Sequence, residues 1–381
     1  MSARRRGLTG VAAVVAMTVT AGAFAAPALA SSPGDRHRAT RKAMEAAVNE
    51  NGPGVTAQAK DRHGTWNAAA GIGDLERQTP RGAHDRYRVG SITKTFVSTV
   101  VLQLVAEGEL SLDDKVGRWL PGVVEGHGHD GDRITVRQLL NHTSGIFNVT
   151  DDPGFRDKVF TEKFLAHRYD TWTPEQEVAI AMRHKPDFKP GKGWEYSNTN
   201  YVLAGMIIEK VTGESYADEI RQRVIKPLGL KATTVPDTDP KMPQPSSRAY
   251  TKLSDAPDAK THDVTEMNPS VMGASGGMIS SSADLNRFYT ALLRGKLLPK
   301  KQLAEMKTAV PMDDDGSRAY GLGLERRKTS CGKMIWGNGG DAPGSSSGAL
   351  ATADGGHALA FNFNGPEADW PSVINAEFCA E

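Results

Sequence analysis

A serine and a lysine at helical spacing are the first candidates for chemistry in this chain. Ser91-Ile92-Thr93-Lys94 follows Gly90, and the apolar pattern of 92–107 predicts a helix that ends at Gly108. Residues three apart on a helix share a face, so Lys94 would lie beside the Ser91 hydroxyl. A buried lysine can lose its proton near neutral pH and then accept the serine proton. The spacing indicates a serine that attacks an acyl group.

The start of this helix would assist the same reaction. Ser91 is expected to cap the helix, whose free N–H groups and dipole would face the negative charge that develops on the acyl oxygen. The S-x-x-K pattern recurs at Ser330-Cys331-Gly332-Lys333, where a predicted strand follows instead of a helix. We interpret that second copy as chance.

The segment Tyr196-Ser197-Asn198 precedes another predicted helix. A tyrosine can carry a proton between a nucleophile and a leaving group when nearby cations lower its pKa. Asn198 could hold the lysine and an amide of the substrate. Taken alone, the segment is better explained as a polar loop before a helix.

A glycine-rich run at 336–344 is the third candidate element. Such a backbone lets a substrate approach closely and supplies N–H donors for an oxyanion hole, although an ordinary turn would look the same. The candidate site therefore has Ser91, Lys94 and Tyr196 as catalytic groups, and Asn198, Asn338, Gly339, Gly340 and Asp341 as substrate-binding or oxyanion-binding groups.

The elements that must position these residues change along the chain. Strands are expected near both ends, at 55–60, 65–70, 319–326, 334–336, 346–352 and 357–363. Further helices are expected at 135–140 with Thr135 as the cap, at 201–211, at 284–293 with Ser282 as the cap, and at 372–378. Residues 31–40 are polar and expected to be frayed. The order predicts an α/β lobe of about 31–112 plus 270–381, with a helical lobe of about 113–269 inserted.

The first 30 residues have the layout of a secretory signal peptide. Three arginines at 4–6 precede an apolar run at 10–26 and the small-residue pattern Ala28-Leu29-Ala30. We expect residues 1–30 to be cleaved and the protein to be secreted, by the Sec or the twin-arginine route. A retained membrane anchor is the alternative, and no second stretch is apolar enough to span a bilayer.

Charge and cysteine content limit the partners. The formal net charge is +1, and no basic cluster suggests nucleic acid as a partner.

In an exported chain, Cys331 and Cys379 are expected to form a disulfide. The run His127-Gly128-His129-Asp130-Gly131-Asp132 is interpreted as a solvated loop, so no metal site is expected. Nothing in the sequence requires more than a monomer.

The chain resembles the serine D-alanyl-D-alanine carboxypeptidases and class C β-lactamases over nearly its whole length after residue 30. The motifs that carry the resemblance are Val89-Gly90-Ser91-Ile92-Thr93-Lys94, Leu140-Asn141-His142-Thr143-Ser144-Gly145, Tyr196-Ser197-Asn198, Gly276-Gly277-Met278-Ile279-Ser280-Ser281 and Tyr320-Gly321-Leu322-Gly323-Leu324. It implies the β-lactamase/DD-peptidase fold, of class α/β (α+β), in which helices from both chain ends flank an antiparallel sheet.

The resemblance also implies roles. Ser91 would form an acyl-enzyme, Lys94 and Tyr196 would handle the proton, and the N–H groups of Ser91 and Asp341 would make the oxyanion hole. Asn198 would position the lysine and the substrate amide, while His142 would be structural. No metal or organic cofactor is implied.

Three positions depart from the family pattern. Asn338 stands where the family usually has Lys or His, so the positive field that would help Tyr196 to ionise is lost. Glu325 stands where the carboxypeptidases hold a substrate carboxylate with Arg, and Asp341 adds a second acid. We expect these acids to repel a carboxylate, so the substrate would lack one or present an amine. Alternatively, Arg326 or Arg327 takes the role of that arginine.

The expected function is that of an exported serine hydrolase acting on a peptide or peptidoglycan-like acyl substrate, with β-lactams as further candidate ligands. A D-alanyl-D-alanine carboxypeptidase is the main interpretation. The alternatives are a D-amino-acid amidase, an aminopeptidase or an esterase on the same scaffold, or a non-catalytic protein that binds peptidoglycan or penicillin. An α/β-hydrolase is rejected, because the G-x-S-x-G copies around Ser275 and Ser346 lack a strand before the serine or a helix after it.

Overall fold

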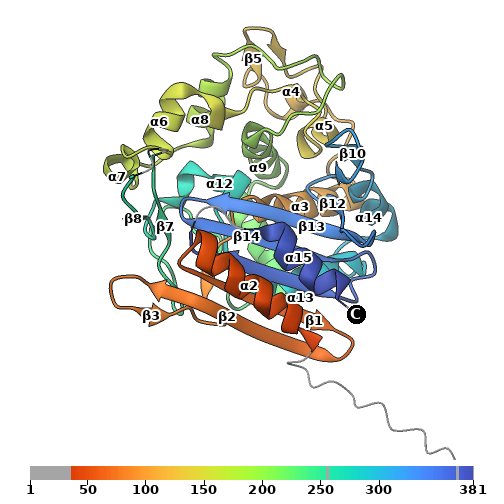
Figure 1. The fold of residues 1–381 in the computed structure, drawn as a ribbon. Coiled ribbons are helices and arrows are strands. Elements are labelled where there is room, and N and C mark those ends of the chain that lie inside the picture. Colours follow the sequence, from red (N-terminus) through yellow and green to blue (C-terminus); the bar gives the residue numbers. More distant parts are fainter. Residues whose placement is uncertain (1–35, 255, 257, 366–368, 381) are drawn as a thin grey trace, which may run out of the picture.

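The computed structural model describes residues 36–380, apart from 255, 257 and 366–368. The predicted signal segment 1–30 lies outside the described residues. Within them, an antiparallel sheet of nine strands has helices on both faces and a helical region along one side (Figure 1). The predicted fold class is confirmed.

The sheet combines strands from both ends of the chain. Its order is β10-β11-β12-β13-β14-β15-β1-β2-β3, so the C-terminal β15 pairs with the N-terminal β1. The bounds are β1 Gly54–Asp61, β2 Gly64–Asp74, β3 Thr79–Pro80, β10 Val310–Pro311, β11 Arg318–Tyr320, β12 Glu325–Lys328, β13 Met334–Ala342, β14 Ser345–Thr352 and β15 Ala358–Phe363.

Alternation along the strands explains why both faces of the sheet are covered. Leu359 and Phe361 of β15 pack under helices α2 (Arg38–Asn51) and α15 (Trp370–Cys379). Their neighbours Ala358 and Ala360 face the opposite core, which includes residues of α3 (Thr93–Glu107) and α13 (Ser282–Leu293). Successive side chains of a strand point to opposite faces, so an almost continuous apolar run marks a strand buried on both sides.

The remaining elements are short and lie mainly in the helical region (Figure 1). Its helices are α4 Val116–Trp119, α5 Val136–Leu140, α6 Pro153–Val159, α7 Phe164–His167, α8 Pro174–Ala181, α9 Asn198–Thr212, α10 Tyr216–Ile220, α11 Lys226–Leu228 and α12 Gly273–Gly276, with α14 Lys300–Met306 beside the sheet. Single turns are η1 Gly90–Ile92, η2 Val149–Asp151, η3 Arg221–Ile225 and η4 Pro269–Val271. Short strand pairs are β4 Arg86–Arg88 with β9 Ile279–Ser281, β5 Glu125–Gly126 with β6 His129–Asp130, and β7 Tyr250–Thr251 with β8 His262–Asp263.

Several local predictions are confirmed. The hairpins β1–β2 and β14–β15 form where the turn signals stand, and Thr135 caps α5 through a capping box with Gln138. Gly108 and Gly213 end α3 and α9 with φ values of +83° and +76°. Glycine adopts this left-handed conformation without a steric penalty.

Other local predictions are wrong. Residue Ser281 caps α13 instead of Ser282, and Ile92 precedes α3 without any side-chain cap, so Ser91 does not cap it. The segment 319–326 is two strands joined by a turn, and β13 extends to Ala342 through the glycine-rich run.

The N-terminal helix is the largest local surprise. Residues 38–40 belong to α2, so the expected fraying of 31–40 does not hold for them. His37 Nδ1 and Thr40 Oγ1 lie 3.0 and 2.7 Å from Glu377 Oε2 of α15. The segment is polar because it binds a carboxylate that is 340 residues away in the sequence, which a local pattern cannot reveal. No helix within the described residues is long and apolar enough to cross a membrane.

Candidate active site

Ser91 lies in the single turn η1, between strand β4 and helix α3. Strand β13 passes directly against this turn. A Cβ atom added at Gly340 would lie 2.1 Å from the Val89 carbonyl oxygen and 2.5 Å from the Ser91 nitrogen. A Cβ added at Gly90, where φ is +51°, would lie 2.6 Å from the Asp341 nitrogen. Glycine at both positions therefore brings the backbone N–H groups of Ser91 and Asp341 to one place.

Lys94 is completely buried one helical turn after Ser91. Its Nζ atom lies 3.0 Å from Ser91 Oγ, 2.8 Å from Asn198 Oδ1 and 2.7 Å from the Ser275 carbonyl oxygen. No carboxylate is among these partners, and burial holds the pKa of Lys94 well below its usual value. The amine is therefore neutral over a pH range in which an exposed lysine is charged.

The partners of a neutral Lys94 determine the direction of its lone pair. The amide oxygen of Asn198 and the carbonyl oxygen of Ser275 only accept hydrogen bonds, so they take the two N–H groups of a neutral amine. The lone pair then faces the hydroxyl of Ser91. This arrangement suits Lys94 to accept the proton of Ser91.

The orientation of Asn198 is fixed by a second asparagine. The backbone N–H of Asn198 donates to Asn148 Oδ1 at 2.9 Å, which identifies that atom as an oxygen. The Nδ2 atom of Asn198 lies 3.3 Å from the same oxygen and 3.3 Å from Thr150 Oγ1. Its own oxygen is thereby directed at Lys94.

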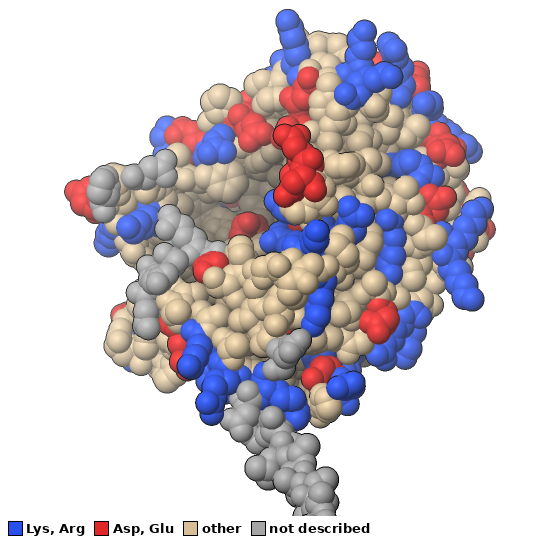
Figure 2. Space-filling view, turned by 45° about the vertical axis from the view of Figure 1, so that its right-hand side comes forward, with Lys and Arg blue, Asp and Glu red and all other residues tan. Residues whose placement is uncertain are grey.

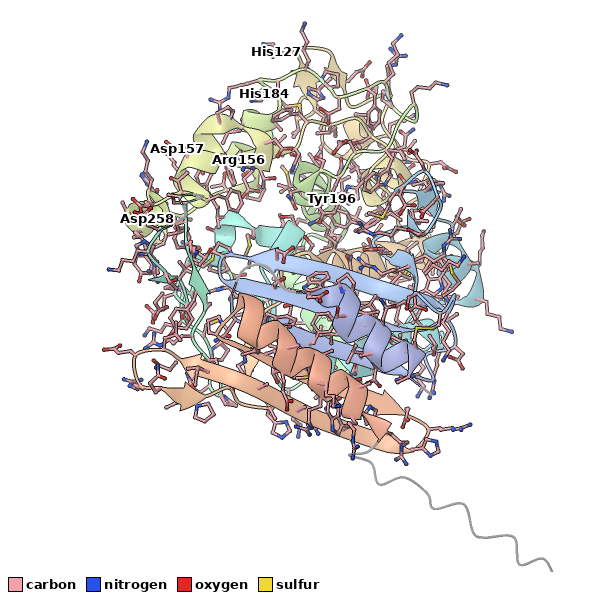
Figure 3. All side chains as sticks on the ribbon, in the orientation of Figure 1. His127, Arg156, Asp157, His184, Tyr196 and Asp258 are labelled. Carbon is pink, nitrogen blue, oxygen red and sulfur yellow. A yellow bond between two sulfur atoms is a disulfide. The ribbon has the colours of Figure 1, made fainter. Side chains whose placement is uncertain are left out.

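Tyr196 comes from the loop before α9, and Figure 3 shows it between α9 and strand β13. Its hydroxyl donates to Ser91 Oγ at 2.6 Å, and its ring centroid lies 4.8 Å from Lys94 Nζ. Burial, followed by the field of Tyr320, raises the pKa of Tyr196 well above its usual value. No cation among the described residues lowers this pKa, in keeping with the loss of a positive group expected at Asn338. Tyr196 stays protonated and is placed to donate a proton.

His142 supports the tyrosine loop without contacting Ser91. Its Nδ1 atom lies 3.2 Å from the Ser197 nitrogen and 3.1 Å from Asn200 Nδ2, and its ring centroid is 4.4 Å from that of Tyr196. Burial keeps the pKa of His142 well below its usual value. The ring is therefore neutral and accepts both hydrogen bonds at Nδ1.

Asn338 lines the active-site cavity, and its side chain is held by other groups of the protein. Its amide is buried, and Nδ2 lies 3.4 Å from each of Thr95 Oγ1, Tyr320 Oη and the Gly323 carbonyl oxygen. Its hydrogen bonds join β13 to α3 and to the loop after β11, and none reaches Tyr196. Gly339 is the site of another close approach, because an added Cβ would lie 2.1 Å from the Trp370 ring.

The repulsion expected from Glu325 is also wrong. Its Oε1 atom accepts from Arg318 Nε at 2.8 Å and from Arg327 Nε at 3.1 Å, so two guanidinium groups flank one buried carboxylate. Arg327 lines the active-site cavity. Arg326 precedes it on β12, so its side chain points to the other face of the sheet. Asp341 lines the cavity and accepts from Ser346 Oγ at 2.7 Å, and burial of its carboxyl group raises the pKa of Asp341.

A cavity of about 900 Å³ contains the site. A hollow between the helical region and the sheet, with acidic and basic side chains near its rim, is visible in Figure 2. Residues from both regions line it, among them Ser91, Tyr196, Asn198, Val149, Phe155, Val159, Phe160, Glu177, Met272, Ser275, Arg318, Glu325, Arg327, Asn338, Gly339, Gly340, Asp341 and Trp370. The structure thus brings together all eight residues proposed from the sequence around one cavity, with Lys94 beneath Ser91.

Sequence reasoning missed several of these residues. Ser275 contributes only its carbonyl oxygen, for which the residue type gives no signal. Trp370 and Glu177 reach the cavity from helices far from any motif. The rejection of an α/β-hydrolase is consistent with the structure. Ser346 lies on strand β14, and His357 pairs with Glu377 at 2.7 Å.

The remaining candidates lie outside the cavity. Cys331 and Cys379 form a disulfide between the β12–β13 turn and α15, and the second S-x-x-K copy belongs to that turn. His127 contacts the Met182 carbonyl oxygen at 2.9 Å, and Figure 3 shows it in the helical region, far from the sheet. Within the part of the chain that the structure describes, no three His, Cys, Asp or Glu side chains gather as a metal site would require.

Comparison with known proteins agrees with this geometry. The family model described as Beta-lactamase matches residues 37–379. The chain belongs to the β-lactamase family. Together with the Ser91–Lys94–Tyr196 arrangement, membership of the β-lactamase family identifies a serine hydrolase related to the penicillin-binding proteins.

Individual members of the β-lactamase family refine the comparison. A D-stereospecific amidohydrolase from Streptomyces sp. is 58% identical with a TM-score of 0.87, over 91% of this chain and 99% of that one. A D-amino acid amidase from Ochrobactrum anthropi SV3, complexed with D-phenylalanine, is 28% identical with a TM-score of 0.78, over 91% and 100%. Penicillin-binding protein 4* of Bacillus subtilis is 28% identical over 266 residues, which are 68% of this chain and 56% of that protein. The chain spans about half the length of the curated relatives that it matches.

Proposed function

We propose that this protein is an exported D-stereospecific amidohydrolase, which cleaves the amide bond on the carbonyl side of a D-amino acid residue. The observation that carries the proposal is the 58% identity to a D-stereospecific amidohydrolase over 91% of the chain, with Ser91 Oγ held between Lys94 Nζ and Tyr196 Oη. These comparisons favour the amidase alternative of the sequence analysis over the carboxypeptidase.

Acylation follows from the contacts of Ser91. Its oxygen attacks the substrate carbonyl while its proton passes to Lys94 Nζ, 3.0 Å away. The oxyanion forms beside the N–H groups of Ser91 and Asp341, which the glycines at 90 and 340 bring together. When the C–N bond breaks, Tyr196 gives its proton to the departing amine. The proton held by Lys94 replaces the one that Tyr196 loses, so both groups become neutral again.

Deacylation uses the same groups in reverse. A water molecule attacks the ester, its proton passes to the neutral Lys94, and Lys94 returns that proton to the departing Ser91 oxygen. The free D-amino acid is released with no net gain or loss of protons by the enzyme. The two groups proposed to move protons, Lys94 and Tyr196, lie 3.0 and 2.6 Å from Ser91 Oγ, which supports these steps.

Beside Tyr320, Arg318 and Arg327 both pair with Glu325 and both line the cavity. Two guanidinium groups and one carboxylate leave this cluster with a net positive charge, so its charge does not exclude a substrate carboxylate. The choice of an amide or a peptide nitrogen as the leaving group therefore rests on the similarity to the D-stereospecific amidohydrolase.

Export rests on the signal-like pattern of residues 1–30 and on the disulfide Cys331–Cys379, which suits an oxidising compartment. Edman sequencing of the protein recovered from culture medium tests it. A first residue near Ser31 supports export, and an intact Met1 in the cell pellet contradicts it.

The activity is tested with the purified protein on paired substrates. We expect D-phenylalanine p-nitroanilide to be hydrolysed at least 100-fold faster than its L-enantiomer and faster than an acyl-D-Ala-D-Ala peptide. Ser91→Ala should abolish turnover. Preference for the D-Ala-D-Ala peptide over its C-terminal amide would instead establish a carboxypeptidase. A protein that binds penicillin without turnover of any substrate would be the non-catalytic alternative.

A further inference from the structure

Glu177 is a buried acid that the proposed mechanism does not use. It belongs to α8, its side chain is 3% exposed, and it lines the active-site cavity. Its Oε1 atom has no hydrogen-bond partner among the described residues. The nearby cavity wall is apolar and includes Val149, Phe155, Val159 and Met272. A carboxyl group in such a place lowers the stability of the fold unless something binds to it.

The other buried glutamates in the described part of the chain show what Glu177 lacks. Each of the three has a basic partner: Glu219 has Arg223, Glu325 has Arg318 and Arg327, and Glu377 has His37 and His357. No ion pair involves Glu177 within the described residues, so none of the cations among them completes this pattern.

The position of Glu177 relative to Ser91 indicates which part of a substrate would meet it. Tyr196, the proposed proton donor to the leaving group, lies toward Tyr320, with ring centroids 6.4 Å apart. Tyr320 pairs with β12, and Figure 1 shows α8 and β12 on opposite sides of α9. Asn198 contacts Thr150 of η2, and α8 packs on η2. The leaving group therefore faces Tyr196 and Tyr320, and the acyl part of the substrate faces η2 and Glu177.

We infer that Glu177 binds an ammonium group carried by the acyl part of the substrate, so that the enzyme selects D-residues with a free amine. This inference rests on the proposed function. Burial raises the pKa of Glu177 well above its usual value, so the protonated form is favoured as long as no cation contacts the carboxyl group. An entering ammonium restores the carboxylate, whose proton goes to solvent, and the apolar wall accommodates the side chain of the residue.

An ammonium can come from two sources, the α-amino group of an N-terminal residue or the side-chain amine of a basic residue. The apolar wall and the single carboxylate suit both equally. Two ligand series separate them: D-phenylalanine amide against its N-acetyl form, and Nα-acetyl-D-lysine amide against its Nε-acetylated form.

Binding to an inactive protein tests the inference without requiring turnover. We would measure Kd by calorimetry with Ser91→Ala, and then with Ser91→Ala carrying Glu177→Gln or, as the control on the same helix, the exposed Glu175→Gln. The expected result is a rise in Kd of at least 10-fold with Glu177→Gln for one amine ligand, a change below 2-fold for its acetylated partner, and no effect of Glu175→Gln. The affected series identifies the source of the ammonium.

Other results would overturn the inference. These are an equal loss for amine and acetylated ligands, no loss for any ligand, or no binding of an amine ligand by Ser91→Ala. Thermal melting accompanies each variant, and Glu177→Gln should melt no lower than its parent because it removes an unpaired buried acid. If the Kd pattern appears but the wild-type protein hydrolyses no D-amino acid amide, the proposed function fails while the ammonium site stands.

Discussion

Tyr196 Oη lies 2.6 Å from Ser91 Oγ although 105 residues separate them in the chain. The contact depends on two different supports. Gly90 and Gly340 fix the turn that carries Ser91, and His142 with Asn148 fixes the loop that carries Tyr196 and Asn198. The candidate site is therefore formed where the sheet meets the helical region.

Removal of the tyrosine hydroxyl should slow acylation more than binding. Tyr196→Phe keeps the ring that packs on His142 but removes the proton donor. We expect kcat to fall by about 10²–10⁴-fold with KM changed by less than about 3-fold. Steady-state kinetics with D-phenylalanine p-nitroanilide and with the corresponding p-nitrophenyl ester provide the check. An ester leaving group needs less protonation, so an equal loss for both substrates would contradict the donor role.

The pH profile should report the state of Lys94. Burial depresses its pKa, and only the neutral amine can accept the proton of Ser91. Activity should therefore be present above this lowered pKa and fall as the pH decreases through it. Burial raises the pKa of Tyr196, so no loss from its ionisation is expected below pH of about 10.

This profile is best measured as kcat/KM for an N-acetylated ester, because the substrate then has no amine that titrates. Asp341→Asn serves as a control, since burial raises the pKa of that carboxyl and it also lines the cavity. The acidic limb should persist in the control. Its disappearance would assign the limb to Asp341 instead of Lys94.

A methyl group at Gly340 should damage the site through the backbone. The added Cβ would lie 2.1 Å from the Val89 carbonyl oxygen and 2.5 Å from the Ser91 nitrogen, so β13 or the serine turn must move. We expect Gly340→Ala to lower kcat by about 10²-fold or more, because displacement of about 1 Å disrupts an oxyanion hole.

The matched control is Gly52→Ala, where an added Cβ has no atom within 4 Å and the backbone is extended at a φ of −171°. Its activity should equal that of the wild type. Wild-type kcat in Gly340→Ala, with the variant folded by circular dichroism, would show that the strand does not position the nucleophile.

Acid stability should depend on Glu377. Burial alone would raise its pKa, but hydrogen bonds from His357, His37 and Thr40 outweigh burial and lower it to about 2. A lowered carboxyl pKa contributes stability that is present above the unfolded value of 4.5 and is lost as the pH falls toward 2. The shift corresponds to roughly 3 kcal/mol at neutral pH.

Glu377→Gln should therefore lower the free energy of unfolding at pH 7 by about 2–3 kcal/mol and flatten its decline between pH 5 and about 2. Urea unfolding at a series of pH values measures both effects, with the exposed Glu162→Gln as the control. An unchanged slope in Glu377→Gln would mean that other carboxyl groups control acid unfolding.

Features that depend on neighbours in the chain could be predicted from local sequence patterns. Helical spacing places Lys94 beside Ser91, turn residues define the hairpins β1–β2 and β14–β15, and Thr135 with Gln138 caps α5. These features are local, since hydrogen bonds within a turn or a hairpin need only a few residues. The family resemblance extended that reading to Tyr196 and Asn198, whose roles remain predictions.

Features that depend on distant partners could not be predicted from the sequence. From the sequence alone, Glu325 was expected to repel a substrate carboxylate, but Arg318 and Arg327 pair with it in the folded protein. The side chain of Asn338 contacts Thr95 and Tyr320, and Thr40 at the polar start of α2 donates a hydrogen bond to Glu377. The charge state and direction of a buried side chain follow from every group packed around it, and those groups come together only when the chain folds.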